Sequence, residues 1–257
     1  MKKILLAMVL VATACCYSDT PAPRRRRPQG SAKASGGLVM SPAAGKYARI
    51  VSAQERVGME VVSAAARSIT LDLWIPVEIS SIPARANPRE VVSAGFAMPR
   101  TGLVVAIVDH EDDVPVIVAP EAGWAIVNVR PLAADNPNQA KLNARTSKEI
   151  WRAFAFANGA GFSAAKPCVL QQTLTLSDLD AVTMPVPSPE QHNKLIDCAV
   201  ARGITPIKLG TYRSACQQGW APFPTNDVQK AIWEEVRADK ERGPTNPITI
   251  QPPNAKK

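Results

Sequence analysis

Residues 144–170, ARTSKEIWRAFAFANGAGFSAAKPCVL, carry the clearest structural signal in the chain. Their apolar side chains recur at three- and four-residue steps with no proline before Pro167, and this spacing predicts a helix. Gly159 and Gly161 then predict the end of that helix, because glycine readily adopts the left-handed conformation that closes a helix. We therefore expect a helix over about residues 139–158, followed by a short loop and a turn that contains a cysteine.

Upstream of this helix, the sequence predicts helices and short strands. Runs of β-branched residues bounded by turn residues are typical of buried strands, and Pro76 indicates an edge strand or a bulge. The expected helices span residues 52–67 and 88–96, and the expected strands span residues 71–82, 103–108, 114–118 and 124–129. This order predicts an α/β fold, with a mixed β-sheet and flanking helices in a single domain.

Downstream, the sequence predicts two more helices, a polar turn and a short strand. The helices are expected at residues 189–202 and 225–237, the turn at 177–180 and the strand at 204–209. The chain is then divided into a signal peptide (1–14), a Pro/Arg-rich tether (15–42), the α/β domain (43–242) and a Pro-rich tail (243–257).

The N-terminus has the pattern of an export signal. Lys2 and Lys3 precede an apolar run, residues 4–14, that is too short to span a bilayer. The run ends in a small-residue cleavage site before Cys15, which resembles a bacterial lipoprotein signal in which this cysteine is acylated. Ala12 stands where such signals usually have Leu, and ordinary cleavage with an unmodified Cys15 is the alternative. We expect an extracytoplasmic lipoprotein of the periplasm or outer membrane, held to the membrane by its lipid.

The net charge of +8 does not indicate a nucleic-acid partner. Six of the positive charges belong to Lys2, Lys3 and the run 24–27, so the rest of the chain carries +2. A nearly neutral domain lacks the basic face that nucleic-acid binding needs. The arginine run could contact anionic head groups, or it could belong to a solvated spacer.

Set beside a known motif, the helix, glycine and cysteine in this order resemble the archaemetzincins, a small branch of the metzincin zinc proteases. The metzincin motif is H-E-x-x-H-x-x-G-x-x-H, with three zinc ligands and a glutamate base. With Gly159 as its glycine, the remaining positions fall on Arg152, Ala153, Phe156 and Phe162. The resemblance implies a metzincin-like fold in which the zinc-binding motif is degenerate.

Residues after the helix carry the rest of the resemblance, which covers residues 103–180. Cys168 matches a cysteine of the family, while Leu170 replaces the methionine of its Met-turn and Ser163 replaces an earlier cysteine. A later Cys-x-x-Cys pair of the family is replaced by Ser188 and Gln191.

A zinc site of this class needs three protein ligands and an open position for water. The chain has only two histidines, so a three-histidine site is impossible. Arg152 would bring a positive charge to the metal position, and Ala153 cannot act as a general base. We therefore expect a pseudoenzyme without metal or cofactor, which binds a peptide or protein or acts as a scaffold at the cell envelope.

An acidic stretch supplies the alternative from another class of function. His110, Glu111, Asp112 and Asp113 lie between two predicted strands. A solvated acidic loop explains them, but an active hydrolase could also be built on His110 with Asp109, Glu111 or Asp113.

Three cysteines, Cys168, Cys198 and Cys216, belong to the expected domain. Thiols outside the cytoplasm tend to pair. We expect a disulfide between Cys198, near a helix end, and Cys216, which follows a strand and a turn. Cys168 would then be free and buried, with a nucleophilic role as the alternative.

Overall fold

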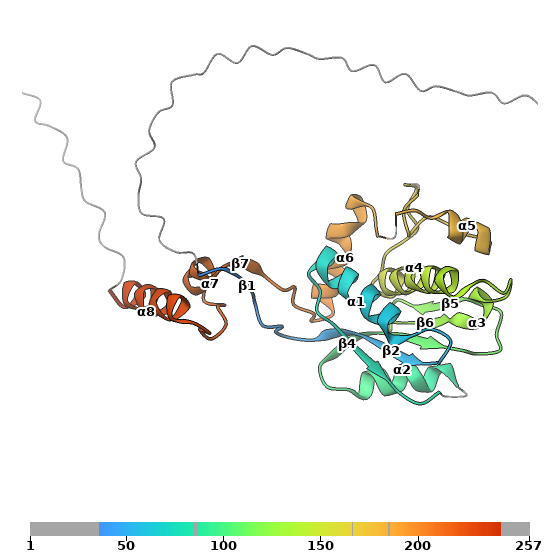
Figure 1. The fold of residues 1–257 in the computed structure, drawn as a ribbon, viewed down its shortest axis with the longest axis horizontal. Coiled ribbons are helices and arrows are strands. Elements are labelled where there is room, and N and C mark those ends of the chain that lie inside the picture. The colour runs from blue at the N-terminus through green and yellow to red at the C-terminus, as the bar shows by residue number, and fades with distance from the viewer. Residues whose placement is uncertain (1–35, 85–86, 166, 185, 243–257) are drawn as a thin grey trace, which may run out of the picture. The chain divides into compact units, whose positions relative to one another are not determined.

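The computed structural model describes residues 36–84, 87–165, 167–184 and 186–242. The predicted signal peptide, the lipidation site Cys15 and the Pro-rich tail lie outside these residues. A five-stranded sheet with the order β3-β2-β4-β6-β5 forms the centre of the fold (Figure 1). Four strands are parallel and β5 is antiparallel to β6, which confirms the mixed sheet. The strands are β2 (Tyr47–Ala53), β3 (Val77–Ser81), β4 (Thr101–Val108), β5 (Val116–Ala119) and β6 (Trp124–Asn128).

Helices cover both faces of the sheet (Figure 1). On one face lie α1 (Met59–Leu73) and α4 (Gln139–Ala157), whose buried side chains belong to the main core. On the other face, α2 (Pro88–Ala97) packs through Val91 and Val92. Coverage of both faces explains why the central strands are continuous apolar runs rather than alternating ones.

The helix expected over residues 139–158 is α4, and its ends are set as the sequence indicates. The Asn138 side chain caps the first turn by accepting a hydrogen bond from the Lys141 amide at 2.9 Å. At the other end Gly159 has φ +88°, a conformation that side chains with a Cβ rarely adopt. Gly159 therefore allows the left-handed backbone conformation that ends α4.

Two upstream predictions are wrong. The helix expected at residues 52–67 begins only at Met59, because residues 47–53 form β2, a strand that was not expected, and residues 54–58 connect the two elements. The strand expected at residues 71–82 is shortened to β3, because α1 continues to Leu73 and ends at Trp74 in the left-handed region. β3 is nevertheless an edge strand, as Pro76 indicated.

The C-terminal part differs most from expectation. The polar turn is a short helix, α5 (Leu176–Ala181), with a capping box formed by Thr175 and Asp178. The predicted helices correspond to α6 (Pro189–Ala201) and α8 (Asp227–Arg242). The strand expected at 204–209 is wrong: the strand is β7 (Leu209–Thr211), and it leads into α7 (Tyr212–Gln218), which was not expected.

Part of the predicted tether is structured. Leu38–Met40, which fall within the expected range 15–42, form β1, and β1 pairs antiparallel with β7. Tyr212, Cys216, Ile232 and Val236 form a separate small core with α7 and α8. Within the described residues, no helix is both long enough and apolar enough to cross a membrane.

Candidate functional site

The end of α4 brings together the side chains at the three ligand positions of the motif. Arg152 and Phe156 are one turn apart, and the Arg152 guanidinium carbon lies 5.6 Å from the centroid of the Phe156 ring. The loop after Gly159 returns Phe162 to this place, where its ring centroid is 5.2 Å from that of Phe156. The spacing of the motif therefore produces the expected convergence, although the side chains are a cation and two aromatic rings.

Arg152 is buried and binds the turn that follows the loop. Its Nη1 donates hydrogen bonds to the carbonyl oxygens of Val169, at 3.1 Å, and Gln171, at 2.8 Å. The resemblance identifies this turn with the Met-turn of the proteases. The guanidinium thus joins the helix to the turn from inside the protein.

Glu149, on the preceding turn of α4, balances the charge of Arg152. Its Oε2 lies 3.1 Å from Arg152 Nε, and both side chains are buried. Burial raises the pKa of the Glu149 carboxyl above its usual value, and the adjacent guanidinium opposes this shift. The position of the glutamate base in the motif is filled by Ala153, which is fully buried and has no polar group.

Cys168 and Leu170 build the turn itself. The Ser163 amide donates to the Leu170 carbonyl at 2.9 Å, and the Leu170 amide donates to Cys168 Sγ at 3.3 Å. Cys168 is fully buried in the main core. A thiol in such surroundings is structural rather than an attacking group, so the geometry does not favour the nucleophilic alternative.

A cavity of about 240 Å³ borders α4 beside Glu149. Asp113 and Pro115, which precede the edge strand β5, form one side, and the segment between the turn and α5 forms another. Its lining consists of Asp113, Pro115, Pro131, Leu132, Glu149, Thr173, Leu174, Thr175, Leu176 and Leu179. Six of the ten lining residues are Pro or Leu, and two, Asp113 and Glu149, are acidic.

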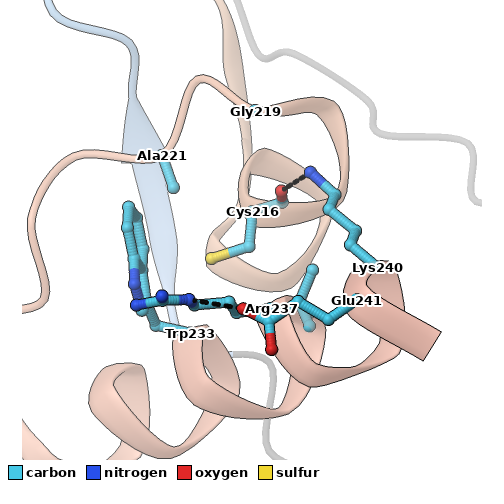
Figure 2. A pocket seen from close by; sticks show the side chains of 8 residues that line it. Cys216, Gly219, Ala221, Trp233, Arg237, Lys240 and Glu241 are labelled. Carbon is cyan, nitrogen blue, oxygen red and sulfur yellow. Dashed lines mark hydrogen bonds and ion pairs between the residues drawn. The ribbon is translucent and has the colours of Figure 1, made fainter. Parts of the chain in front are cut away.

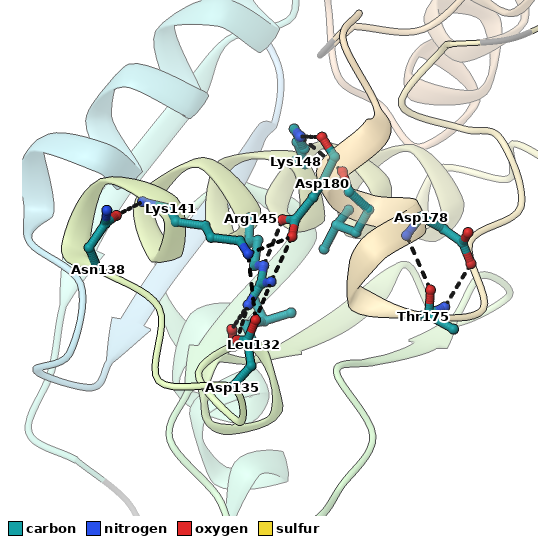
Figure 3. A network of polar contacts seen from close by, with 10 residues as sticks. Leu132, Asp135, Asn138, Lys141, Arg145, Lys148, Thr175, Asp178 and Asp180 are labelled. Carbon is teal, nitrogen blue, oxygen red and sulfur yellow. Dashed lines mark hydrogen bonds and ion pairs between the residues drawn. The ribbon is translucent and has the colours of Figure 1, made fainter.

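A buried arginine beside this cavity joins α4 to α5 and to the segment around Leu132 (Figure 3). Arg145 on α4 binds Asp135 through both Nη atoms, at 2.6 and 2.9 Å, and Asp180 through Nε and Nη2, both at 2.7 Å. It also donates to the Leu132 carbonyl at 2.8 Å. The hydrogen bond from Arg145 lowers the pKa of Asp180 to about 2, although burial acts in the other direction.

His110 lies at a second place, at the carboxyl end of β4. Its Nδ1 is 3.0 Å from Asp112 Oδ2, and both residues line a cavity of about 360 Å³ that also includes Arg89 and Trp124. The structure thus pairs His110 with Asp112, a residue that the sequence did not single out for this role.

The three acidic residues considered as partners of His110 have other surroundings. Burial acts to raise the pKa of Asp109, but the hydrogen bonds that it accepts from Arg130 and Arg56 together outweigh burial and keep this pKa below its usual value. Glu111 is largely exposed, and Asp113 lines the cavity beside Glu149.

The expected disulfide is absent. Cys168, Cys198 and Cys216 are all free thiols, with Cys198 on α6 and Cys216 on α7. Burial raises the pKa of Cys216. Among the residues that the structure describes, no three His, Cys, Asp or Glu side chains are grouped so as to hold a metal ion.

No family model and no curated protein matches this chain. The structure is similar to the crystal structure of archaemetzincin from Methanopyrus kandleri, with a TM-score of 0.51 and 16% identity over 61% of this chain and 96% of that one. It is also similar to a zinc-dependent peptidase from Methanocorpusculum labreanum, with a TM-score of 0.48 and 14% identity over 58% of this chain and 99% of that one. The likeness to the Methanopyrus kandleri structure shows that the chain has an archaemetzincin-like fold.

Zinc, which this fold family implies, does not fit the residues at the motif positions. Neither a guanidinium nor a phenyl ring donates an electron pair to Zn²⁺, and the site requires three such ligands. The fixed charge of Arg152 would also repel the ion.

Sequence reasoning located the motif positions but missed Glu149 and Arg145. Their spacing could have indicated them. Glu149 lies four residues after Arg145 and three before Arg152, so all three charged residues share the buried side of α4.

Proposed function

We propose that this chain, with its archaemetzincin-like fold, is an exported and lipid-anchored pseudo-metalloprotease that binds a peptide or protein at the cell envelope. It would act without zinc-dependent proteolysis, metal or cofactor, in the periplasm or at the outer membrane. The observation that carries the proposal is the buried pair of Arg152 and Glu149. In this pair, Arg152 occupies the first ligand position and its charge is balanced by Glu149. Arg152 also donates hydrogen bonds to the carbonyls of Val169 and Gln171 in the turn after the motif.

The cavity beside Glu149 supports binding in place of catalysis. It is bordered by apolar side chains and by Pro115, the residue before the edge strand β5. An edge strand can accept an extended peptide through main-chain hydrogen bonds, and an adjacent pocket can then select a side chain. The ionisable residues of the described lining, Asp113 and Glu149, are both acidic, and Arg152 pairs with Glu149. The preferred side chain would therefore be a cationic one that Asp113 can bind.

Metal content and proteolysis test the loss of zinc chemistry together. The purified chain, dialysed without chelator, is expected to hold far less than one transition metal per molecule by mass spectrometry. It should also leave an unfolded substrate protein uncleaved with and without added Zn²⁺. One tightly held metal per chain with metal-dependent cleavage would overturn the proposal.

A matched pair of variants tests the peptide cavity. Leu174 lines the cavity and is 82% exposed, so Leu174→Arg adds a cation at the rim without disturbing the core. Leu209→Arg makes the same change on β7, at another exposed leucine. In a peptide-library screen, lysine- and arginine-containing peptides should bind the wild type and Leu209→Arg, and should bind Leu174→Arg at least tenfold more weakly. Equal binding by all three proteins would place the site elsewhere.

The anchor is tested separately from the binding site. Labelling of cells with a palmitate analogue should mark the wild type and not Cys15→Ala. An unlabelled wild type would remove the lipid from the proposal and leave the binding function to be judged by the library screen.

An active hydrolase at His110 is the second candidate, because His110 and Asp112 form a close pair in a cavity on another side of the fold. A carboxylate beside Nδ1 orients the ring of many general bases. The discriminating variant is His110→Ala. Loss of an esterase or peptidase activity with an unchanged circular dichroism spectrum would favour the hydrolase, and an activity equal to that of the wild type would exclude His110.

A further inference from the structure

A pocket between α7 and α8 lies outside the elements that form the motif (Figure 2). It has a volume of about 370 Å³, within the range typical of small-molecule sites. Its inner wall is apolar and is formed by the side chains of Cys216, Ala221, Trp233 and Val236. Two of these residues, Cys216 and Val236, belong to the small core, so the wall is rigidly supported.

Charged side chains stand only on the α8 side of the pocket. Arg237 Nε donates to Glu241 Oε1 at 3.0 Å, and this pair is internally neutral. Lys240 Nζ donates to the Cys216 carbonyl at 3.0 Å, which holds the ammonium against α7 at the border of the pocket (Figure 2). An ammonium group has three N–H donors, and among the described residues this bond takes up one of them. Among the described lining residues, Lys240 therefore supplies one positive charge that no carboxylate of the lining balances, with N–H donors left for a ligand.

We propose that this pocket binds a small amphiphilic monoanion, a free carboxylate with a short aliphatic or aromatic body. The body would lie against Trp233, Val236 and the Cys216 thiol, and the carboxylate would accept hydrogen bonds from Lys240. Charge selects this class of ligand: the Arg237–Glu241 pair cancels, so a cationic or neutral amphiphile would gain the apolar contacts but not the ionic one. All lining residues of this pocket lie between Cys216 and Glu241, outside the motif region, so ligand binding here does not depend on the function proposed for that region.

Cys216 provides a direct readout, because its thiol lines the pocket. We would follow alkylation of each cysteine of the reduced full chain by peptide mass spectrometry, with octanoate as the probe. At a concentration ten times the Kd measured by calorimetry, octanoate should slow alkylation of Cys216 about tenfold, since only the empty pocket exposes the thiol. Alkylation of Cys198 on α6 should keep its rate. Octylammonium at the same concentration should protect Cys216 far less.

Two lysine variants on the same helix separate the site from general charge effects. Lys240→Gln removes the ammonium at the border of the pocket and should weaken octanoate binding about tenfold, the loss expected for one charge-assisted hydrogen bond. Lys230→Gln removes the same charge from an exposed position of α8 that is not part of the pocket, and should bind octanoate like the wild type. Ala221→Leu fills the pocket and should abolish binding.

The proposal fails if calorimetry detects no octanoate binding at millimolar concentration. It also fails if octylammonium and octanoate protect Cys216 equally, or if Lys240→Gln and Lys230→Gln bind alike. Protection of Cys198 to the same extent as Cys216 would show an effect on the whole chain rather than occupancy of this pocket, and would likewise overturn it.

Discussion

Arg152 and Glu149 form a buried ion pair on α4, with Nε 3.1 Å from Oε2, and the same guanidinium reaches the carbonyls of the following turn. Removal of the cation leaves a buried carboxylate without its partner, and such changes typically cost about 3–5 kcal/mol. We therefore expect Arg152→Met to lower the free energy of unfolding by about this amount in urea titrations. Arg237→Met, which breaks an exposed pair with Glu241, is the matched control and should cost less than about 1 kcal/mol.

The pH dependence distinguishes a lost ion pair from lost packing. The pKa of Glu149 is raised in the folded state, so its contribution to stability is fully present below its unfolded pKa of 4.5 and is lost as the pH rises through the folded value. Without Arg152, the stability lost on ionisation of Glu149 should be greater. The free energy of unfolding of Arg152→Met should therefore fall further below that of the wild type at pH 7 than at pH 4. An equal difference in free energy of unfolding between wild type and Arg152→Met at pH 4 and pH 7 would contradict the ion-pair account. The same holds if adding Glu149→Gln to Arg152→Met does not reduce this difference at pH 7.

The convergence of positions 152, 156 and 162 predicts that a metal site can be rebuilt. A variant with Arg152→His, Ala153→Glu, Phe156→His and Phe162→His has three imidazoles and a carboxylate at the positions of the motif. We expect it to bind one Zn²⁺ per chain by mass spectrometry and to gain thermal stability when Zn²⁺ is added, since binding to the folded state alone stabilises it.

The control for the rebuilt site keeps Phe162 and changes only the other three positions. Two histidines do not complete a three-ligand site, so this variant should hold Zn²⁺ much more weakly. If the fourfold variant folds but binds no more Zn²⁺ than the control, the three positions do not converge as the structure has them.

Asp180 predicts a loss of stability in acid. Its pKa in the folded state, about 2, lies below the ordinary value of 3.8 for an aspartate, chiefly because of its hydrogen bond with Arg145. Its contribution is therefore present above 3.8 and disappears as the pH falls through about 2. Asp180→Asn should lower the free energy of unfolding at pH 7 by about 1.5–3 kcal/mol, the value of a hydrogen bond to a charged group. It should also flatten the decline between pH 4 and pH 2, whereas Asp239→Asn at an exposed pair should change neither.

Local patterns in the sequence were sufficient for α4, β4 and β6, because the first has helical spacing with a glycine stop and the strands are β-branched runs buried on both faces. β2 was missed although its last six residues are all buried. β2 is a strand because it pairs with β3 and β4, which follow it in the chain. The seven residues of β2 do not by themselves indicate these partners.

In the candidate site, too, the sequence predicts the features that depend on local spacing and not those that depend on distant partners. The motif positions follow from spacing along one helix, so the sequence located them. The pairing of Arg145 with Asp180 joins residues 35 positions apart, and the bonds of Arg152 to the turn span 17 and 19 positions. Charged residues on an apolar helix face indicate buried partners, but the identity of those partners is set by the tertiary fold.

Asn128, at the end of β6, holds the loop that carries His110. Its Oδ1 accepts a hydrogen bond from the His110 amide at 2.9 Å, and its Nδ2 donates to the carbonyls of His110, at 3.0 Å, and Asp112, at 2.7 Å. The side chain is buried, so Asn128→Leu leaves these backbone groups without partners at a cost of about 2–4 kcal/mol.

Local loss of protection is the sharper readout for Asn128. Amide hydrogen exchange across residues 109–113 should accelerate more than tenfold in Asn128→Leu, while the amides of α4 should change only as far as global stability does. Asn143→Leu, which removes a surface amide from α4, should leave the loop unchanged. If the loop exchanges at the wild-type rate in Asn128→Leu, another contact fixes it. If the chain is a hydrolase that uses His110, Asn128→Leu should lose the esterase or peptidase activity although His110 is unchanged. The reason is that the imidazole ring would no longer be held beside Asp112.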